Sequence, residues 1–119
     1  MSNITESLNE LITVDGGMAA ALVDSESGLL LGAAGSGLDL EIASAGNTEV
    51  VRAKLRTMKS LGLDDSIDDI LVTLSTQYHI IRPLASNPAV FLYLVLNRAK
   101  SNLALARLKA KETEGKIQF

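Results

Sequence analysis

The stretch that most constrains the fold runs from Ala89 to Asn97, AVFLYLVLN. Successive side chains of a strand point to opposite faces, so this segment would place an apolar set on each face of a sheet. The first set is Val90, Leu92, Leu94 and Leu96, and the second is Ala89, Phe91, Tyr93 and Val95. A strand that is apolar on both faces must be covered on both. The sequence therefore predicts a central strand between two helical layers.

The remaining chain supplies the neighbours that this strand needs. Its 119 residues predict a single domain spanning residues 1–119, with a core built mainly from aliphatic side chains because only 3% of the residues are aromatic. Gly115 is expected to end the last helix, and residues 113–119 are expected to fray. In chain order the pattern predicts a helix from Ile4 capped by Asn3, strands Met18–Asp24 and Leu29–Ala33, a helix from Asp39 to about Leu61, strands Ile70–Ser75 and Tyr78–Leu84, the central strand, and a helix from Asn97 to about Glu112.

The long middle helix carries more apolar surface than one sheet contact uses. One stripe contains Ile42, Ala45, Val51, Leu55, Met58 and Leu61, and a second contains Ala43, Val50 and Ala53. A helix with two apolar stripes commonly covers one surface in its own domain and one on a partner. Gly46 in its interior costs about 1 kcal/mol relative to alanine, which a close helix contact at that point would explain.

Charge and composition exclude several classes of protein. Residues 1–51 hold eight acidic side chains and no Lys or Arg, whereas residues 52–119 hold all eleven basic ones, and the net charge is −3. A net acidic chain without clustered aromatics is a poor nucleic-acid binder. The chain has no cysteine, no leader-like N-terminus and no apolar run of about 20 residues. We expect a cytoplasmic protein with no membrane insertion and no nucleic-acid partner.

No catalytic constellation is visible in the sequence. The glycine-rich turn from Gly32 to Gly37 lacks the spacing of a phosphate-binding loop, and we expect it to serve as a turn that needs positive φ. His79 is the one histidine, so a histidine metal cluster is impossible, and a structural or surface histidine is favoured. Asp64, Asp65, Asp68 and Asp69 do not follow the calcium-loop spacing and are expected to face water. We expect no catalytic residue, cofactor or metal.

Three segments carry a resemblance to a known family. They are GMAAALVDSESGLLL in the first hairpin, DDILVTLSTQYHIIRPL in the second, and FLYLVLNRAKSNLALAR across the central strand and last helix. Together with the order of elements, they resemble the roadblock (dynein light chain-like) domain family, and the long final helix resembles its prokaryotic branch. The resemblance implies an α+β, profilin-like fold. Its antiparallel five-stranded sheet has the order 2-1-5-4-3, with the first and last helices on one face and the long helix on the other.

The resemblance also implies a homodimer, in which the middle helices pack together and the third strands pair across the two-fold axis. The residues independently favour it, because the third strand would be an apolar sheet edge that proteins usually cover or pair. The expected interface residues are Ile42, Val51, Leu55, Met58, Ile70, Val72 and Leu74.

Members of this family bind or regulate Ras-like small GTPases or act as motor-complex adaptors. The resemblance therefore implies a non-enzymatic regulator or scaffold for such a GTPase. Arg52, Arg56 and Lys59 recur at i, i+4 and i+7 and are expected to form a partner-binding rim. Two alternatives stay open: an adaptor or light-chain subunit of a motor or signalling complex, and a small ligand-sensing domain. The second is disfavoured because the inner positions lack the convergent polar groups of a ligand pocket.

Overall fold

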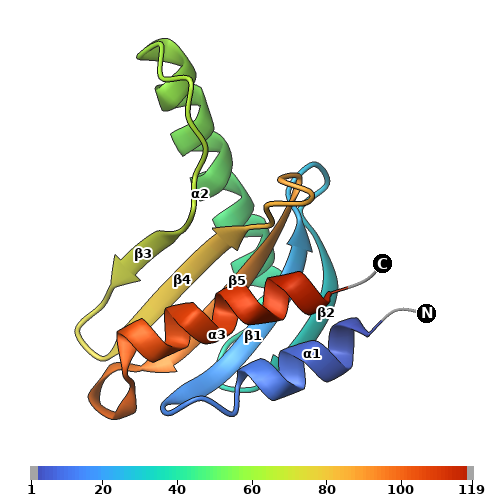
Figure 1. The fold of residues 1–119 in the computed structure, drawn as a ribbon, viewed down its shortest axis with the longest axis vertical. Coiled ribbons are helices and arrows are strands. Elements are labelled where there is room, and N and C mark those ends of the chain that lie inside the picture. Colours follow the sequence, from blue (N-terminus) through green and yellow to red (C-terminus); the bar gives the residue numbers. More distant parts are fainter. Residues whose placement is uncertain (1–2, 118–119) are drawn as a thin grey trace.

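The computed structural model describes residues 3–117 and has two helical layers around one sheet (Figure 1). Its elements are α1 (Ile4–Leu11), β1 (Gly17–Asp24), β2 (Leu29–Gly35), α2 (Leu40–Ser60), β3 (Ile70–Thr73), β4 (Gln77–Pro83), β5 (Val90–Asn97), a 3₁₀ helix η1 (Arg98–Lys100) and α3 (Leu103–Lys116). The five strands are antiparallel in the order β2-β1-β5-β4-β3. Helices α1 and α3 cover one face and α2 crosses the other. The predicted fold class and strand order are confirmed.

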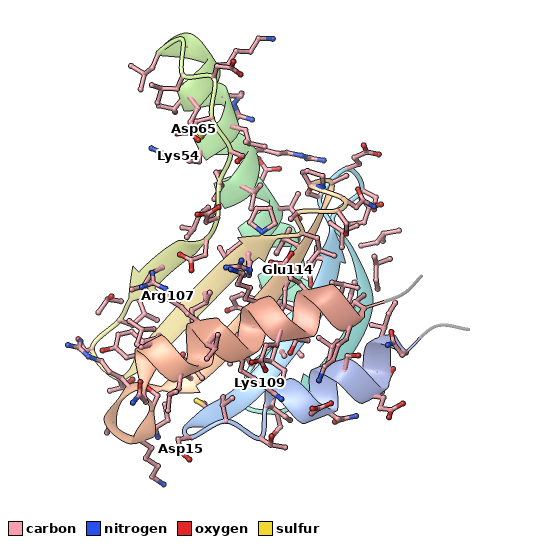
Figure 2. The ribbon with its side chains drawn as sticks, viewed as in Figure 1. Asp15, Lys54, Asp65, Arg107, Lys109 and Glu114 are labelled. Atoms are coloured by element: carbon pink, nitrogen blue, oxygen red, sulfur yellow. The ribbon has the colours of Figure 1, made fainter. Side chains whose placement is uncertain are left out.

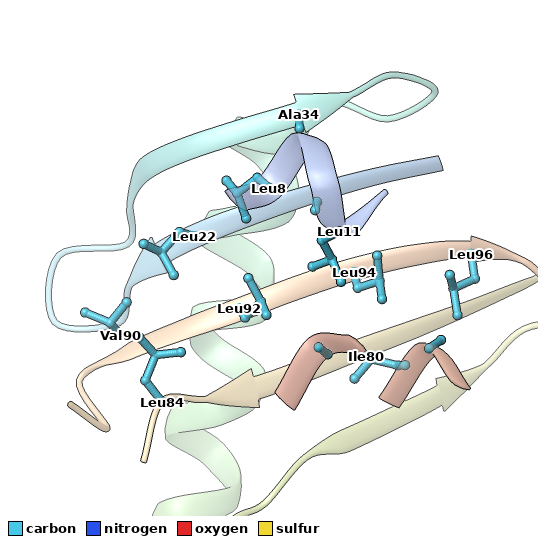
Figure 3. Packing of buried hydrophobic residues seen from close by; sticks show 13 residues of the cluster. Leu8, Leu11, Leu22, Ala34, Ile80, Leu84, Val90, Leu92, Leu94 and Leu96 are labelled. Atoms are coloured by element: carbon cyan, nitrogen blue, oxygen red, sulfur yellow. The ribbon is translucent and has the colours of Figure 1, made fainter. Parts of the chain in front are cut away.

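The central strand is β5, which pairs with β1 on one side and β4 on the other. Its side chains divide between two cores as the alternation predicted. Leu94 and the other β5 side chains on its face of the sheet pack with Leu8 and Leu11 from α1 (Figure 3) and with Ala106 from α3. Tyr93 and the β5 side chains on the opposite face pack with Val51 from α2. The strand is buried along Val90–Leu96, because helices cover both of its apolar faces.

Helix α3 begins later and ends later than the sequence predicted. The chain leaves β5 through η1, where Asn97 Oδ1 accepts a hydrogen bond from the backbone N–H of Ala99 at 3.1 Å. Asn102 is the residue that caps α3, accepting from the N–H of Leu105 at 3.1 Å. Two asparagines that favour caps therefore split the predicted helix into two pieces.

The expectation that residues 113–119 fray is wrong for residues 113–116, which are helical. Thr113 is buried, and the Glu114 carboxylate accepts from Arg82 Nε at 2.5 Å and from the N–H of Ala85 at 2.9 Å. These contacts hold the last turn against β4 despite Gly115. Gln118 and Phe119 lie outside the described residues.

The predicted side-chain cap of α1 by Asn3 is also wrong. Asn3 occupies the N-cap position, but it makes no side-chain cap hydrogen bond. Its amide nitrogen instead donates to the backbone carbonyl of Lys116 at 2.6 Å. Since the start of α1 lies beside the end of α3, a tertiary hydrogen bond has replaced the local one.

The glycine-rich turn needs positive φ, as predicted, at Gly35 and Gly37. Gly35 has φ +81°, and a Cβ there would lie 2.1 Å from the carbonyl oxygen of Met18. Only glycine combines that backbone angle with such a close approach. The turn lets β2 end against β1 and lets Asp39 begin α2, where its carboxylate accepts from the N–H groups of Glu41 and Ile42, each at 3.1 Å.

Candidate functional site

The C-terminal half of α2 extends past the sheet and forms an arm with the segment that returns to β3 (Figure 1). We use "arm" for residues 52–69. Figure 2 places Lys54 on its helix and Asp65 on its returning segment. Along the arm α2 leaves its own sheet, so Lys54, Leu55 and Arg56 are exposed to another molecule while Met58 stays buried.

Two sides of α2 have different roles. The sheet-facing side buries Ser44, Thr48, Val51 and Met58. The opposite side carries Ile42, Gly46, Val50 and Ala53 at i, i+4, i+8 and i+11, and all four are exposed. We call these four residues the α2 seam. A Cβ at Gly46 would meet nothing within 4 Å, so no close contact inside residues 3–117 explains a glycine there.

A groove of about 810 Å³ joins the α2 seam to the entry of β3. Val50 and Ala53 form its helical wall, and Ile67 and Ile70 form the wall that continues into β3. Lys54, Asp65 and Asp68 also line it. A molecule that entered this groove would contact both the apolar helix face and the sheet edge.

Strand β3 is an open edge of the sheet. It pairs with β4 through Ile70↔Ile81 to Thr73↔Tyr78, and no other described strand lies on its outer side. Leu74, directly after it, is 42% exposed. Unpaired N–H and C=O groups beside apolar side chains favour pairing with another strand.

The structure divides the seven expected interface residues into two groups. Ile42 is 71% exposed, Ile70 and Val72 are half-buried on β3, and Leu74 is exposed, so these four line the seam and edge. Val51 and Met58 are buried within the chain. Leu55 is exposed but continues the sheet-facing side of α2 beyond the sheet, where it lines a 340 Å³ cavity with Arg82 and Pro83.

The structure divides the apolar stripe of α2 from which sequence reasoning drew Ile42, Val51, Leu55 and Met58 as expected interface residues. Val51 and Met58 of that stripe are buried inside the chain and Ile42 and Leu55 are exposed, and Val50 and Ala53 of the second stripe are exposed as well. The sequence did contain a signal for the exposed face of Val50 and Ala53, since small residues and Gly46 mark a helix face that another helix can approach closely.

The expected rim is only partly free. Arg52 Nη2 donates to the carbonyl of Glu26 at 2.5 Å, and its Nη1 pairs with Glu49 Oε1 at 3.2 Å. Arg56 and Lys59 are exposed and make no ion pair within residues 3–117. Helical geometry places these three side chains on a different side of α2 from the groove. A partner could therefore reach Arg56 and Lys59 while the groove is occupied.

An ion pair between distant segments fixes the base of the arm, and sequence reasoning missed it. Arg107 on α3 (Figure 2) binds Asp69, which lies just before β3, with two hydrogen bonds, Nε to Oδ2 at 3.0 Å and Nη2 to Oδ1 at 3.1 Å. Asp64, Asp65 and Asp68 are exposed, so the prediction that the acidic cluster faces water holds for three of its four members. Partners 38 residues apart leave no local pattern that could have predicted this pair.

His79 and Tyr93 form a hydrogen-bonded pair under the start of α2. The Tyr93 hydroxyl lies 2.9 Å from His79 Nδ1, and His79 Nε2 lies 2.8 Å from Gln77 Oε1. Burial lowers the pKa of His79. Burial also raises the pKa of Tyr93, an effect that a hydrogen bond with the Asn47 side chain opposes. These hydrogen bonds give His79 a structural role. His79 and Tyr93 also line a shallow hollow that includes Ile42 and Gly46.

We expect the stability of the protein to fall as the pH drops through about 6.5, the ordinary pKa of histidine. The pKa of His79 is lower in the folded state, so the unfolded chain binds the proton first and acid favours unfolding. The loss is complete below the folded-state pKa. Urea midpoints at pH 7.5 and 5.5 measure it, and His79→Gln should remove most of the difference. An unchanged pH dependence in that variant would contradict this assignment.

Metal-binding clusters and membrane-spanning helices are absent from the described part of the chain. No three His, Cys, Asp or Glu side chains in residues 3–117 are grouped so that they could hold a metal ion. Nor does any helix in the same range have the length and apolarity needed to span a membrane.

Comparisons with known proteins find similarity in structure and not in sequence. No family model and no curated protein matches the chain. MglB from Myxococcus xanthus superimposes with a TM-score of 0.83 at 19% identity, covering 95% of this chain and 83% of that one. A Roadblock/LC7 domain from Streptomyces avermitilis gives 0.81 at 13% identity, covering 92% and 90%. The chain has the roadblock/LC7 fold.

The gliding protein mglB from Thermus thermophilus has the same roadblock/LC7 fold, with a TM-score of 0.77 at 18% identity over 92% of this chain and 81% of that one. These neighbours are bacterial proteins, in agreement with the resemblance to the prokaryotic branch. At such low sequence identity, the similarity to these structures shows a shared arrangement of helices and strands and nothing further. Any partner of this chain has to be argued from its own surface.

Proposed function

We propose that this chain forms a homodimer in the cytoplasm and binds a Ras-like small GTPase, as a non-enzymatic regulator or scaffold. The observation that carries the proposal is the shared groove of the α2 seam and β3, in which an exposed apolar helix face adjoins an unpaired sheet edge. The GTPase is the kind of partner that the roadblock resemblance implies.

A second copy satisfies both open features at once. Related by a two-fold axis, two α2 seams would pack against each other while two β3 edges pair, which continues the sheet across the dimer. Gly46 would permit a close approach of the helices, because a Cβ there has open space on this side. One MglB structure with this fold is described as having a tetrameric arrangement, which supports assembly as a property to test here.

The rim provides a separate surface for the GTPase. Arg56 and Lys59 are exposed, lack ion-pair partners in the described part of the chain, and lie on a side of α2 that the groove does not use. A dimer would present two such rims. Cations beside apolar surface favour electrostatic steering and recognition of a protein with acidic groups.

A pull-down from cells of the source organism tests the GTPase partner. Wild-type protein should recover a small GTPase loaded with GDP or with a GTP analogue, and Arg56→Glu/Lys59→Glu should recover much less. A Lys100→Glu/Lys111→Glu variant is the matched control, because both lysines are exposed and lie outside α2. Recovery of a motor or sensor-kinase component with no GTPase in either state would replace the proposal with the adaptor role. If a GTPase is recovered, hydrolysis measured with and without this protein separates an activator from a scaffold.

A further inference from the structure

The outer edge of β2 is a second unpaired edge, at the opposite end of the sheet from β3. Strand β2 pairs with β1, and no other strand in residues 3–117 lies beside it. Natural edge strands are usually short or protected by charge, proline or a covering segment. The sequence of β2, LLLGAAG, has seven residues with no charge and no proline. This edge is longer and less protected than the four-residue edge of β3.

Two leucines on this edge project into solvent. Leu29 is 65% exposed and Leu31 is 44% exposed. Leu31 is the extra residue of a bulge, because Leu22 pairs with Gly32 while Val23 pairs with Leu30. A bulge can re-aim a side chain next to a functional site. Open backbone groups beside exposed leucines are the features that strand addition uses, with main-chain hydrogen bonds for affinity and side-chain contacts for selectivity.

The hairpin that carries this edge is held in place by the rest of the fold. Ser25 donates both its N–H and its hydroxyl to the carbonyl of Ala89, each at 2.8 Å. Arg52 reaches from α2 to the carbonyl of Glu26 at 2.5 Å. A pre-ordered edge lowers the entropy cost of binding, since only the incoming segment must be ordered.

The charges around the edge define what it can accept. Residues 1–51 contain no Lys or Arg, and Glu26 lies in the turn just before β2. Glu41 lies beside Leu29 and Leu30 in the same surface hollow. The nearby cation, Arg52, donates to the backbone carbonyl of Glu26 and pairs with the carboxylate of Glu49, which leaves the Glu26 carboxylate unused by this arginine. Two copies meeting here would bring like charges together, whereas a cationic segment would be attracted.

We propose that the outer edge of β2 binds an extended segment of a partner protein that carries both basic and aliphatic residues, adding it as a sixth strand. The segment's aliphatic side chains cover Leu29 and Leu31, and its basic side chains face Glu26 and Glu41. This site lies on a different edge from the proposed dimer and acts independently of it. The protein would thereby hold a second partner while its α2 seam and rim are occupied.

A labelled nonapeptide of alternating valine and lysine is the probe. We expect a rise in fluorescence anisotropy at micromolar protein, and slower amide hydrogen exchange at residues 29–35 in the bound protein. Leu29→Lys/Leu31→Lys should weaken binding at least tenfold. Leu105→Lys/Leu108→Lys is the matched control, because Leu105 and Leu108 are 57% and 54% exposed on α3, and it should leave binding unchanged.

Other results would overturn the proposal. One is the absence of binding at millimolar peptide, and another is exchange protection located away from β2. Equal binding of a peptide that is N-methylated on alternate amides would show that no strand is added. If the Leu29→Lys/Leu31→Lys variant formed a smaller assembly in solution than the wild-type protein, the edge of β2 would pair two copies of this chain instead.

Discussion

Replacing Leu94 with alanine should lower the free energy of unfolding by about 2–5 kcal/mol. Leu94 is 1% exposed at the middle of β5, where it lies between Ala20 on β1 and Ile80 on β4 and beneath the layer formed by α1 and α3. The smaller side chain would leave a cavity that a sheet paired on both sides cannot collapse to fill. Urea unfolding followed by circular dichroism measures the loss.

Leu108→Ala is the control for this experiment. Leu108 is 54% exposed on α3, so its truncation should change stability by no more than about 0.5 kcal/mol. Both variants must be measured at the same protein concentration, because dimerisation would add to the apparent stability. A loss below about 1 kcal/mol for Leu94→Ala would mean that β5 is not the central strand of a packed core.

Replacing Val50 with glutamate should weaken the homodimer by about 100-fold or more. The two-fold axis would bring two new carboxylates into the apolar seam, where their mutual repulsion and the burial of charge together cost about 3–5 kcal/mol. A factor of ten corresponds to about 1.4 kcal/mol. The monomer itself should tolerate the change, because Val50 is 40% exposed and glutamate favours helix more than valine does. Sedimentation velocity over a concentration series gives the dissociation constant.

Leu55→Glu is matched to Val50→Glu in helix, charge and exposure, since Leu55 is 46% exposed. The two side chains project about 140° apart around α2. We expect Leu55→Glu to leave the dimer intact, because Leu55 faces the β4–β5 connection and not the groove. If Leu55→Glu dissociated the dimer and Val50→Glu did not, the interface would lie on the sheet-facing side of the arm.

The strands and the position of the central strand were predictable because alternation is a local property of the chain. The two apolar sets around Leu94 and Tyr93 separated into the two cores as their spacing required. Boundaries that depend on distant partners were less predictable. The start of α3 depends on Asn102, and its end depends on the ion pair of Glu114 with Arg82. The spacing of residues does not show which of two asparagines will cap a helix, and it does not show which distant side chain will pair with a glutamate.

The candidate interface was only partly predictable for a related reason. Periodicity gives two apolar stripes on α2 but does not say which one the chain's own sheet will cover. Burial decided it, with Val51 packed inside and Val50 exposed. The exposure of the rim could not be predicted either, because the hydrogen bond from Arg52 to Glu26 depends on how the β1–β2 hairpin lies against α2.

The central claim is that two copies pack through the α2 seam and β3, and the mass of the protein in solution tests it most directly. Light scattering coupled to size exclusion at micromolar concentration should give twice the 12.6 kDa of one chain. The same measurement on Val50→Glu should give the mass of one chain. A wild-type protein that stays at the mass of one chain throughout this concentration range would contradict the account.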